Sequence, residues 1–230
     1  MLSVRELSVS YSESGRAVDG VSFELRGGVN AALIGCNGAG KTTLLLALAG
    51  VLEPSGGSVG VDGTEFGKKT RRDTRRRIGL VFQNPDDQLF MPSISDDVAF
   101  GPRNMGLTES EARRRAENAL RELGIAHLAS RSPLRLSGGE KRLAAIATVL
   151  SMDPDYILLD EPTAFLDPRA RRSLAEILSR LPQGKLIATH DIPFAQSLCG
   201  RVLLMKDGKL IADGGAEILR DETLLEAAGL

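Results

Sequence analysis

A glycine-rich stretch near the N-terminus has the residue types and spacing of a phosphate-binding loop. Gly35 to Thr42 reads GCNGAGKT and fits the pattern G-x-x-x-x-G-K-[ST]. Its glycines allow a tight turn whose backbone N–H groups point inward at phosphate oxygens, while Lys41 would reach the outer phosphates and the Thr42 hydroxyl would bind Mg²⁺. The residues predicted to hold the phosphates are Asn37, Gly38, Ala39, Gly40, Lys41, Thr42 and Thr43.

The segments on either side of this loop are those that the motif requires. The apolar run Ala31–Ile34 predicts a buried strand before the loop, and Thr42–Ala49 predicts a helix after it. The helix N-terminus adds partial positive charge to the loop. This context disfavours the alternative of a glycine-rich turn that binds nothing.

A second site candidate is the pair of acids that ends the apolar run Ile157–Leu159. In a parallel sheet this strand would end at the same edge as the phosphate loop. Asp160 could then hold Mg²⁺, directly or through water, and Glu161 could accept a proton from an attacking water. The alternative is an ordinary helix or turn start, where acids are common, but the phosphate loop favours the functional interpretation.

The segment Leu136–Glu140, with sequence LSGGE, predicts a helix start that has a further property. Ser137 and Glu140 have the spacing of a capping box, which is a sufficient structural reason for both residues. A cap does not need two consecutive glycines, whereas Gly138 and Gly139 expose N–H groups that can bind an anion. One chain would then carry two phosphate sites, and a nucleotide held between two copies of the chain would reconcile them.

Taken together, these motifs resemble the ATPase subunits of ABC transporters over essentially the whole chain. They are Gly35–Thr42, Gln83, Leu136–Glu140, Tyr156–Glu161, Leu166-Asp167 and His190, in the order and spacing of that family. Within the family, Val81–Phe90 (VFQNPDDQLF) is most similar to the ATPases of energy-coupling-factor transporters, which import vitamins or cobalt and nickel ions.

The resemblance implies a head-to-tail dimer, a homodimer or a heterodimer with a related subunit, that holds two ATP molecules with Mg²⁺ at its interface. Glu161, His190 and Gln83 would be catalytic, and Thr42, Gln83 and Asp160 would hold the metal. The partner's nucleotide would be bound by Ser137, Gly138, Gly139, Glu140 and Asp167. Tyr11 would stack on adenine, although packing within its strand is an alternative; a purely structural role is the alternative for His190.

The resemblance also implies a transmembrane partner that docks on Gln83–Met91. Acids at Asp86 and Asp87 beside the apolar Leu89, Phe90 and Met91 predict a groove for a basic amphipathic helix. The alternative is that Leu89 and Phe90 anchor a helical region to the core. Gln83 would link nucleotide state to this partner.

Other function classes are less well supported. The alternatives are the ATPase of another ABC transporter, a soluble ABC ATPase that acts on nucleic acid or ribosomes, and a non-hydrolysing regulator. The basic stretch Lys68–Arg77 has no interleaved aromatic residue, and the net charge of −1 gives no general attraction to nucleic acid, so we expect no nucleic-acid partner. Intact Asp160, Glu161 and His190 disfavour the regulator.

Bulk properties predict a cytosolic protein, and the resemblance to ABC ATPases implies that it is a peripheral subunit at the cytoplasmic face of the cell membrane. No apolar run approaches the ~20 residues of a spanning helix, and the N-terminus lacks a signal segment. Two cysteines, Cys36 and Cys199, do not suggest a disulfide framework. Phe165 is bulkier than is usual before Leu166-Asp167.

The pattern of elements predicts one α/β domain over residues 1–230, with an N-terminal antiparallel β layer and an α-helical insertion, and the resemblance implies that its core is a P-loop NTPase of ABC type. The core would comprise 1–83 and 151–230, with a helical subdomain at 84–150. Leu2–Tyr11 predicts a strand with a bulge near Arg5, and Thr108 with Glu111 predicts a capping box. The remaining elements expected are strands Val21–Leu25, Ser58–Val61, Ile78–Phe82, Leu186–Thr189, Val202–Met205 and Leu210–Ala212, and helices after Thr108, from Ser137, over Arg169–Leu181 and over Pro193–Leu198.

Overall fold

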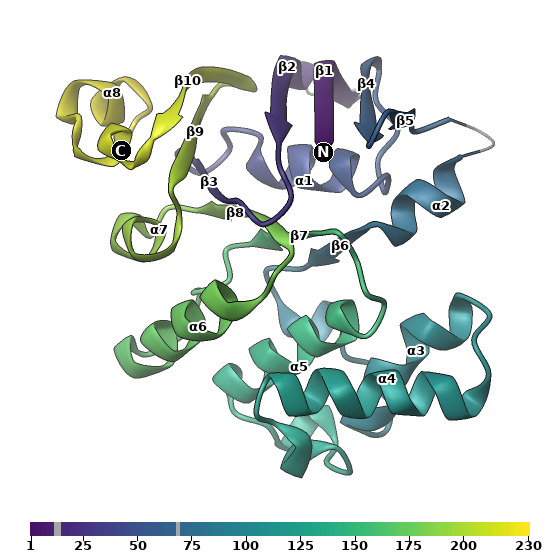
Figure 1. The fold of residues 1–230 in the computed structure, drawn as a ribbon. Coiled ribbons are helices and arrows are strands. Elements are labelled where there is room, and N and C mark those ends of the chain that lie inside the picture. The colour runs from purple at the N-terminus through teal and green to yellow at the C-terminus, as the bar shows by residue number, and fades with distance from the viewer. Residues whose placement is uncertain (12–14, 68–69) are drawn as a thin grey trace.

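The computed structural model describes residues 1–11, 15–67 and 70–230, which form two β-sheets and several helices (Figure 1). A small antiparallel sheet covers one side of a larger, mostly parallel sheet, and a group of helices lies on the other side. The predicted α/β class with an N-terminal antiparallel layer is therefore confirmed. Lys68 and Lys69 of the basic stretch lie outside the described residues.

The larger sheet has the strand order β10-β9-β3-β8-β7-β6. Its strands are β3 (Asn30–Ile34), β6 (Ile78–Val81), β7 (Tyr156–Asp160), β8 (Gly184–Thr189), β9 (Arg201–Lys206) and β10 (Lys209–Gly215). β9, β3, β8, β7 and β6 pair in parallel, so their carboxyl ends share one edge; Ile34 is opposite Thr189, and Asp160 is opposite Ala188. The phosphate loop, Glu161, His190 and Gln83 follow four of these strands and therefore meet at that edge.

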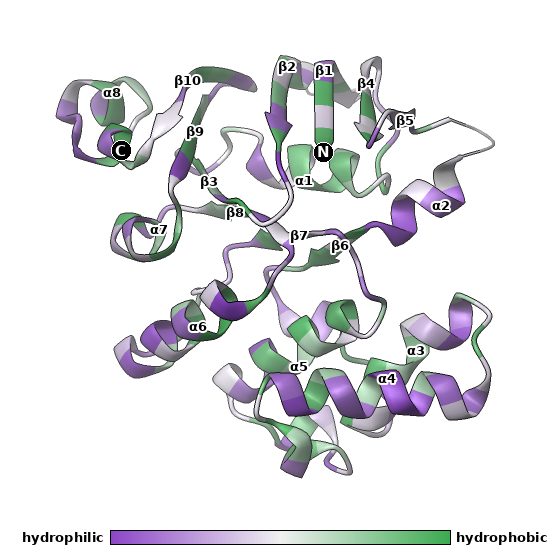
Figure 2. Ribbon diagram, viewed as in Figure 1, coloured by the Kyte–Doolittle hydropathy of each residue, from purple (hydrophilic) through white to green (hydrophobic). Residues whose placement is uncertain are grey.

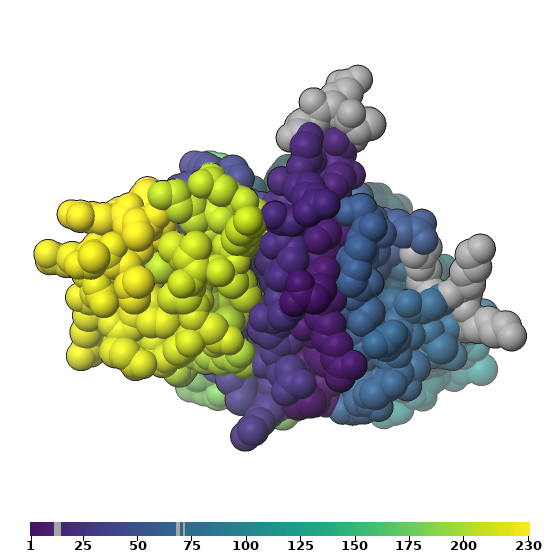
Figure 3. All heavy atoms as spheres, turned by 90° about the horizontal axis from the view of Figure 1, so that it is seen from above, coloured from purple at the N-terminus to yellow at the C-terminus, as the bar shows by residue number. Residues whose placement is uncertain are grey.

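The antiparallel sheet has the order β2-β1-β4-β5 and packs over helix α1 (Lys41–Leu48). Its strands are β1 (Leu2–Tyr11), β2 (Gly15–Leu25), β4 (Gly56–Val61) and β5 (Thr64–Glu65). Figure 3 shows β1 and β2 of this layer, in purple, between the yellow C-terminal elements and the blue region of β4 and α2. Val21, Phe23 and Leu25 alternate inward and form one core cluster with Leu44 and Leu48 of α1. The core thus holds the start of α1, and with it the phosphate loop, in place.

The irregularity predicted near Arg5 is confirmed. The pairing of β1 with β2 shifts register between Val4 and Leu7, and Glu6 has a φ of 45°. A Cβ on Gly57 would lie 2.3 Å from the carbonyl oxygen of Glu6, so the bulge requires a glycine opposite it.

Helices occupy the chain between β6 and β7. They are α3 (Ile94–Asn104), α4 (Glu109–Glu122) and α5 (Gly138–Leu150), with short 3₁₀ turns η1 (Pro85–Asp87), η2 (Ala126–Leu128) and η3 (Pro133–Arg135). One face of α4 is apolar and buried, as Ala112, Ala116 and Leu120 show. Together with residues of α3 and α5 these side chains form one core cluster.

Two details of this region differ from the sequence predictions. Thr108 caps α4 by accepting the N–H of Glu111, but the Glu111 carboxylate pairs with Arg114 instead of returning to the Thr108 N–H, so only half of the capping box forms. Helix α3 was not predicted as a separate element. Its N-cap, Ser93, accepts the N–H of Asp96 in the same S-x-x-[DE] pattern, which was a usable signal.

The remaining helices flank the two sheets. They are α2 (Arg71–Arg76), α6 (Pro168–Arg180), α7 (Ile192–Leu198), the turn η4 (Ala216–Arg220) and α8 (Glu222–Ala227). Figure 2 shows apolar residues concentrated in α1 and the central strands, and polar residues on α2 and on one side of α4. Within the described part of the chain, no helix has both the length and the apolar character needed to cross a bilayer.

Candidate nucleotide site

A pocket of about 300 Å³ opens at the carboxyl edge of the larger sheet. Ten of the residues predicted to act on a nucleotide line it: Asn37, Gly38, Gly40, Lys41, Thr42, Thr43, Gln83, Asp160, Glu161 and His190. The eleventh lining residue, Ala17 of β2, was not predicted, because nothing in its local sequence marks it. Its carbonyl oxygen would lie 2.3 Å from a Cβ on Gly40, so the antiparallel layer closes tightly on the loop.

The phosphate loop takes its shape from glycines at positions that exclude a side chain. A Cβ on Gly35 would lie 2.3 Å from the Met205 carbonyl oxygen, and Gly40 precedes α1 with a φ of 100°. Ala39 does not line the pocket: its side chain is buried, and its N–H donates to the Cys36 carbonyl oxygen at 3.2 Å. The other predicted loop residues line the pocket.

Lys41 is held inside this loop. Its Nζ donates to the carbonyl oxygens of Gly35 at 2.6 Å and Cys36 at 3.1 Å. It also lies 3.9 Å from Glu161 Oε1, and its side chain is only 7% exposed. A buried ammonium with these acceptors places positive charge at the base of the pocket, where an anion would be attracted.

Thr42 and Asp160 form a hydroxyl–carboxylate pair beside Lys41. Thr42 Oγ1 donates to Asp160 Oδ2 at 2.8 Å. Burial raises the pKa of Asp160, and the nearby Glu161 charge raises it further, whereas the Thr42 hydrogen bond and the charges of Lys41 and Arg142 lower it. Oxygen ligands of this kind are those that Mg²⁺ prefers, with its remaining positions filled by water and phosphate.

Glu161 is fixed by the end of the neighbouring strand β8. Its Oε2 accepts from Thr189 Oγ1 at 3.2 Å and from the His190 backbone N–H at 3.4 Å. His190 Nδ1 lies 3.0 Å from the same oxygen, while the His190 side chain is 63% exposed. The carboxylate therefore has a defined position at the pocket, with a partly exposed imidazole beside it.

Tyr11 lies at the side of this pocket rather than in the sheet interior. Its hydroxyl is 3.4 Å from Thr43 Oγ1, and the side chain is 42% exposed, whereas Leu7 and Val9 are buried. Packing against Leu7 and Val9 thus does not account for Tyr11. An exposed ring next to the phosphate loop is available to stack on a base.

The second predicted anion loop lies outside the pocket. Ser137 caps α5, and the capping box is complete: Ser137 Oγ accepts the Glu140 N–H at 3.4 Å, and Glu140 Oε2 accepts the Ser137 N–H at 2.8 Å. Ser137 and Gly138 are exposed, and a Cβ on Gly138 would meet nothing within 4 Å. The structure does not bring Ser137–Glu140 together with Lys41 in one chain.

Asp167 also lies outside the pocket. It is exposed and caps α6, since its Oδ1 accepts the Ala170 N–H at 2.8 Å. The preceding Phe165 has a φ of 63° and is 93% exposed, so its ring extends from the loop between Glu161 and α6.

Comparison with known proteins identifies the family of this site. A family model described as "ABC transporter" matches residues 18–164, which include the phosphate loop, Ser137–Glu140 and Glu161. The chain belongs to the ABC transporter ATPase family. It is accordingly an ABC-type ATPase, the ATP-binding subunit of a transporter. The geometry of the pocket fits this assignment, because it joins a phosphate loop to two carboxylates.

Individual ABC relatives cover nearly the whole chain. A putative ABC transporter ATP-binding protein of Geobacter sulfurreducens is 46% identical over 100% of this chain and 93% of its own length. The energy-coupling factor transporter ATP-binding protein EcfA of Carboxydothermus hydrogenoformans is 43% identical over 99% of this chain and 85% of its own length. The resemblance to energy-coupling-factor ATPases that the sequence indicated is confirmed.

A solved structure supports the same placement within the ABC ATPases. It is cbiO1 from Clostridium perfringens, described as part of the ABC transporter complex cbiONQ. It is 39% identical, covers 97% of this chain and 91% of its own, and superposes with a TM-score of 0.86. The fold described above is thus that of an ABC ATPase subunit.

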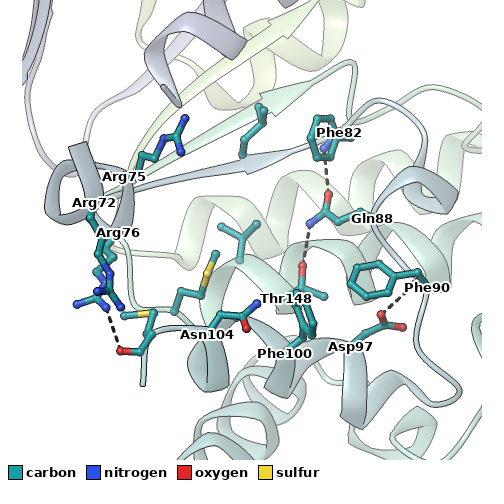
Figure 4. Close-up of a pocket in the computed structure, with 15 residues that line it drawn as sticks. Arg72, Arg75, Arg76, Phe82, Gln88, Phe90, Asp97, Phe100, Asn104 and Thr148 are labelled. Atoms are coloured by element: carbon teal, nitrogen blue, oxygen red, sulfur yellow. Dashed lines mark hydrogen bonds between the residues drawn. The ribbon is translucent and has the colours of Figure 1, made fainter. Parts of the chain in front are cut away.

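A groove of about 620 Å³ lies between α2 and the helical region of this ABC ATPase (Figure 4). Arg72, Arg75 and Arg76 line one end. The other end is lined by Phe82, Phe90, Phe100, Gln88 and Asp97. Phe90 packs edge to face on Phe100, with ring centroids 5.0 Å apart, and remains 63% exposed.

The prediction that Leu89, Phe90 and Met91 form an exposed apolar cluster is wrong for Leu89. Leu89 is 6% exposed and belongs to the apolar core, so the alternative that it anchors the helical region holds for this residue. Asp86 pairs with Lys141 at 2.6 Å, so one of the two predicted acids is already neutralised within the chain. Phe90 is the apolar residue of this segment that faces the groove.

Proposed function

We propose that this chain is the ATP-hydrolysing subunit of an energy-coupling-factor type importer, working as an ATP-sandwich dimer on a transmembrane partner. The observation that carries this proposal is the separation of two anion-binding loops in one chain. Lys41 lies in a pocket, whereas Ser137–Glu140 lies exposed outside that pocket. Each ATP would be completed by the loop of a second subunit.

The phosphate loop binds the triphosphate of ATP. The backbone N–H groups of Asn37–Thr43 surround the phosphates at the N-terminus of α1. The Ala39 N–H is the exception, because it donates to the Cys36 carbonyl oxygen. Lys41 exchanges its bonds to the Gly35 and Cys36 carbonyls for phosphate oxygens, which carry full negative charge. Tyr11 stacks on the adenine ring, because it is the exposed aromatic side chain beside Thr43.

Thr42, Asp160 and Gln83 hold Mg²⁺. The hydroxyl–carboxylate pair of Thr42 and Asp160 fits a cation that prefers oxygen, and Gln83 lines the same pocket. When bound, the ion neutralises charge on the β- and γ-phosphates. A cation bound beside Asp160 would oppose the effect of burial and lower the pKa of this carboxyl.

Glu161 acts as the general base for ATP hydrolysis. Its carboxylate is held by Thr189 and by the His190 backbone, so it can accept a proton from a water that attacks the γ-phosphorus. His190 contacts the γ-phosphate, because its imidazole is exposed at the pocket and is positioned by Glu161. The products are ADP and phosphate.

Ser137, Gly138, Gly139 and Glu140 complete the site of the second subunit, which is an identical or related chain. The open N-terminus of α5 offers backbone N–H groups to the γ-phosphate of the nucleotide on the other subunit. Asp167, exposed at the start of α6, reaches across the same interface.

The transmembrane partner docks in the groove beside Gln83–Met91. Phe90 and Phe100 pack on each other there but remain exposed, which suits an amphipathic helix. The subunit is then peripheral at the cytoplasmic face of the membrane. The importer carries cobalt or nickel ions or a vitamin such as biotin, as the resemblance to energy-coupling-factor ATPases implies.

The docking part of this proposal is tested with Phe90→Ala in cells that express the transporter. Phe90 is 63% exposed, so its removal should leave the fold and soluble ATPase activity intact. We expect Phe90→Ala to be lost from washed membranes, whereas the matched control Leu134→Ala, at a residue that is 87% exposed and outside the groove, stays bound. Equal membrane association of both variants would remove the docking role. Uptake assays with labelled cobalt, nickel and biotin then identify the substrate.

A further inference from the structure

Arg142 is a fully buried cation that bridges two functional segments of the chain. It lies on α5, in the first turn and a half after Ser137, and is 2% exposed. Its Nη1 donates to the Phe82 carbonyl oxygen at 2.7 Å, and its Nη2 donates to the Gln83 carbonyl oxygen at 2.6 Å. The planar guanidinium thus holds the backbone of two consecutive residues at the end of β6.

Packing alone does not explain an arginine at this position. The Nε of Arg142 is buried without a partner, and burial lowers the pKa of the guanidinium to about 10, although the charge of Asp160 partly offsets this effect. A buried cation carries a desolvation cost that an apolar side chain of similar volume would avoid. What an apolar side chain cannot do is hold two carbonyl groups in one rigid geometry.

The whole segment after β6 is attached to α5. Lys141 pairs with Asp86 at 2.6 Å, next to Arg142 along the helix. Gln88 donates to the Ala145 carbonyl oxygen at 2.9 Å and to Thr148 Oγ1 at 2.7 Å, and it accepts the Phe82 N–H at 3.1 Å. Figure 4 shows the bonds of Gln88 with Phe82 and Thr148. Segment 82–88 and α5 therefore form one hydrogen-bonded unit.

The two ends of this unit face different sites. The Gln83 side chain lines the pocket that contains Lys41 and Glu161 of its own chain. The other end is Ser137–Glu140, the loop that α5 presents to the outside. A displacement of Gln83 toward a bound nucleotide would be transmitted through the Arg142 fork to the start of α5, five residues away.

We propose that Arg142 is a positioning residue that couples Gln83, in the nucleotide pocket of one chain, to the Ser137–Glu140 loop that this chain offers to a second subunit. The inference rests on the proposed ATP-sandwich dimer. It adds that Arg142 is the side chain through which Gln83, in a chain's own pocket, sets the geometry of the loop for the other site. The two-state element is the unit made of segment 82–88 and α5.

The test uses a fluorescent reporter, because the chain contains no tryptophan. Leu134→Trp places one beside the loop at a residue that is 87% exposed. The parent protein also carries Glu161→Gln, and emission is read with Mg-ATP at concentrations where sedimentation shows a monomer. We expect ATP to change the emission of the parent. In Arg142→Lys, the change should fall to about a tenth, because losing one charge-assisted hydrogen bond shifts a two-state equilibrium roughly tenfold.

Two further variants separate coupling from structural damage. Arg113→Lys alters an arginine of the same helical region that bonds Ser95, Asp96 and Glu109 but not segment 82–88, so it should keep the full signal. Gln83→Ala leaves the Arg142 bonds to the backbone in place and should abolish the signal. Binding of radiolabelled ATP by equilibrium dialysis should be the same in Arg142→Lys and the parent.

The proposal is overturned if Arg142→Lys gives the parent's emission change, if it loses ATP binding together with the signal, or if the parent monomer shows no change. Should Arg142→Lys be unfolded, the signal in Gln83→Ala decides: a full change overturns the coupling and its loss supports it. ATP-driven dimerisation at high concentration is measured separately, so a failure of the dimer proposal is distinguishable from a failure of the coupling.

Discussion

Two glycine-rich loops of this molecule, Gly35–Thr42 and Ser137–Glu140, each precede a helix but have opposite surroundings. The first is enclosed: Gly35 and Gly40 are pressed against backbone of β9 and β2, and Lys41 is 7% exposed. The second is open: Ser137 and Gly138 are exposed, and a Cβ on Gly138 would meet nothing within 4 Å. The capping box joins Ser137 and Glu140, and Gly138 between them stays exposed.

This difference explains why one chain can carry two phosphate-binding loops that do not form a single site within that chain. An enclosed loop gains from burial and from charges such as Lys41, so it can bind a triphosphate alone. An open helix N-terminus offers a few N–H groups and a partial charge, which is too weak for tight binding without further contacts. In the proposed dimer, the open loop would therefore act only when a second subunit brings an anion to it.

The largest expected effect breaks the chemistry of the enclosed site. Glu161→Gln should lower the turnover of Mg-ATP about 100- to 10,000-fold, because an amide cannot accept the proton of the attacking water. ATP binding should persist, since the hydrogen bonds of Thr42 to Asp160 and of Lys41 within the loop remain. Phosphate release and ATP binding are measured on the same preparation. Near-normal turnover would remove Glu161 from the role of general base.

The second effect breaks the enclosed loop itself. Lys41→Ala should weaken ATP binding about 10- to 100-fold, because hydrogen bonds to charged groups contribute about 1.5–3 kcal/mol. Lys209→Ala is the control: this lysine pairs with Asp19 outside the pocket and should leave the Kd unchanged. Calorimetric titration gives both values. Wild-type affinity in Lys41→Ala would mean that the backbone of the loop is sufficient for binding.

The smallest expected effect concerns backbone strain, which the phosphate loop avoids and the loop before α6 does not. The phosphate loop places glycines at its left-handed positions, whereas the exposed loop before α6 places Phe165 there, with a φ of 63°. Phe165→Gly should raise the free energy of unfolding of the monomer by about 1 kcal/mol, because the strain is relieved and a 93% exposed ring makes few contacts. Phe165→Ala keeps a Cβ and should show no gain. Equal stability of both variants in urea denaturation would contradict the strain.

The sequence predicted those parts of the site that local patterns define. Gly35–Thr42 and Asp160-Glu161 are contiguous, and the apolar runs before them indicate parallel strands, so their meeting at one sheet edge followed. Ser137–Glu140 was also predictable, because it too is a contiguous motif. That it lies outside the pocket of its own chain was an inference from having two anion loops, and the geometry agrees with it.

The parts that could not be predicted depend on contacts between distant residues. Leu89 and Phe90 are adjacent and apolar, yet Leu89 is buried and Phe90 is exposed, which only the packing of the helical region decides. The contacts of Arg142 with Phe82 and Gln83 span about sixty residues and leave no local pattern. Helix α3 was obscured by Gly101 and Pro102, although its Ser93 cap was visible.

The central claim, that the open loop of one chain completes the enclosed site of another, is tested most directly by sedimentation velocity. Glu161→Gln is compared with Glu161→Gln/Gly139→Asp, each with and without Mg-ATP. A Cβ on Gly139 would meet only Ala170 Cβ, at 3.8 Å, so the aspartate should not disturb the fold but would repel a phosphate. We predict that ATP converts the first protein from monomer to dimer and leaves the second monomeric with ATP still bound. A first protein that stays monomeric, or a second that dimerises equally, would contradict the account.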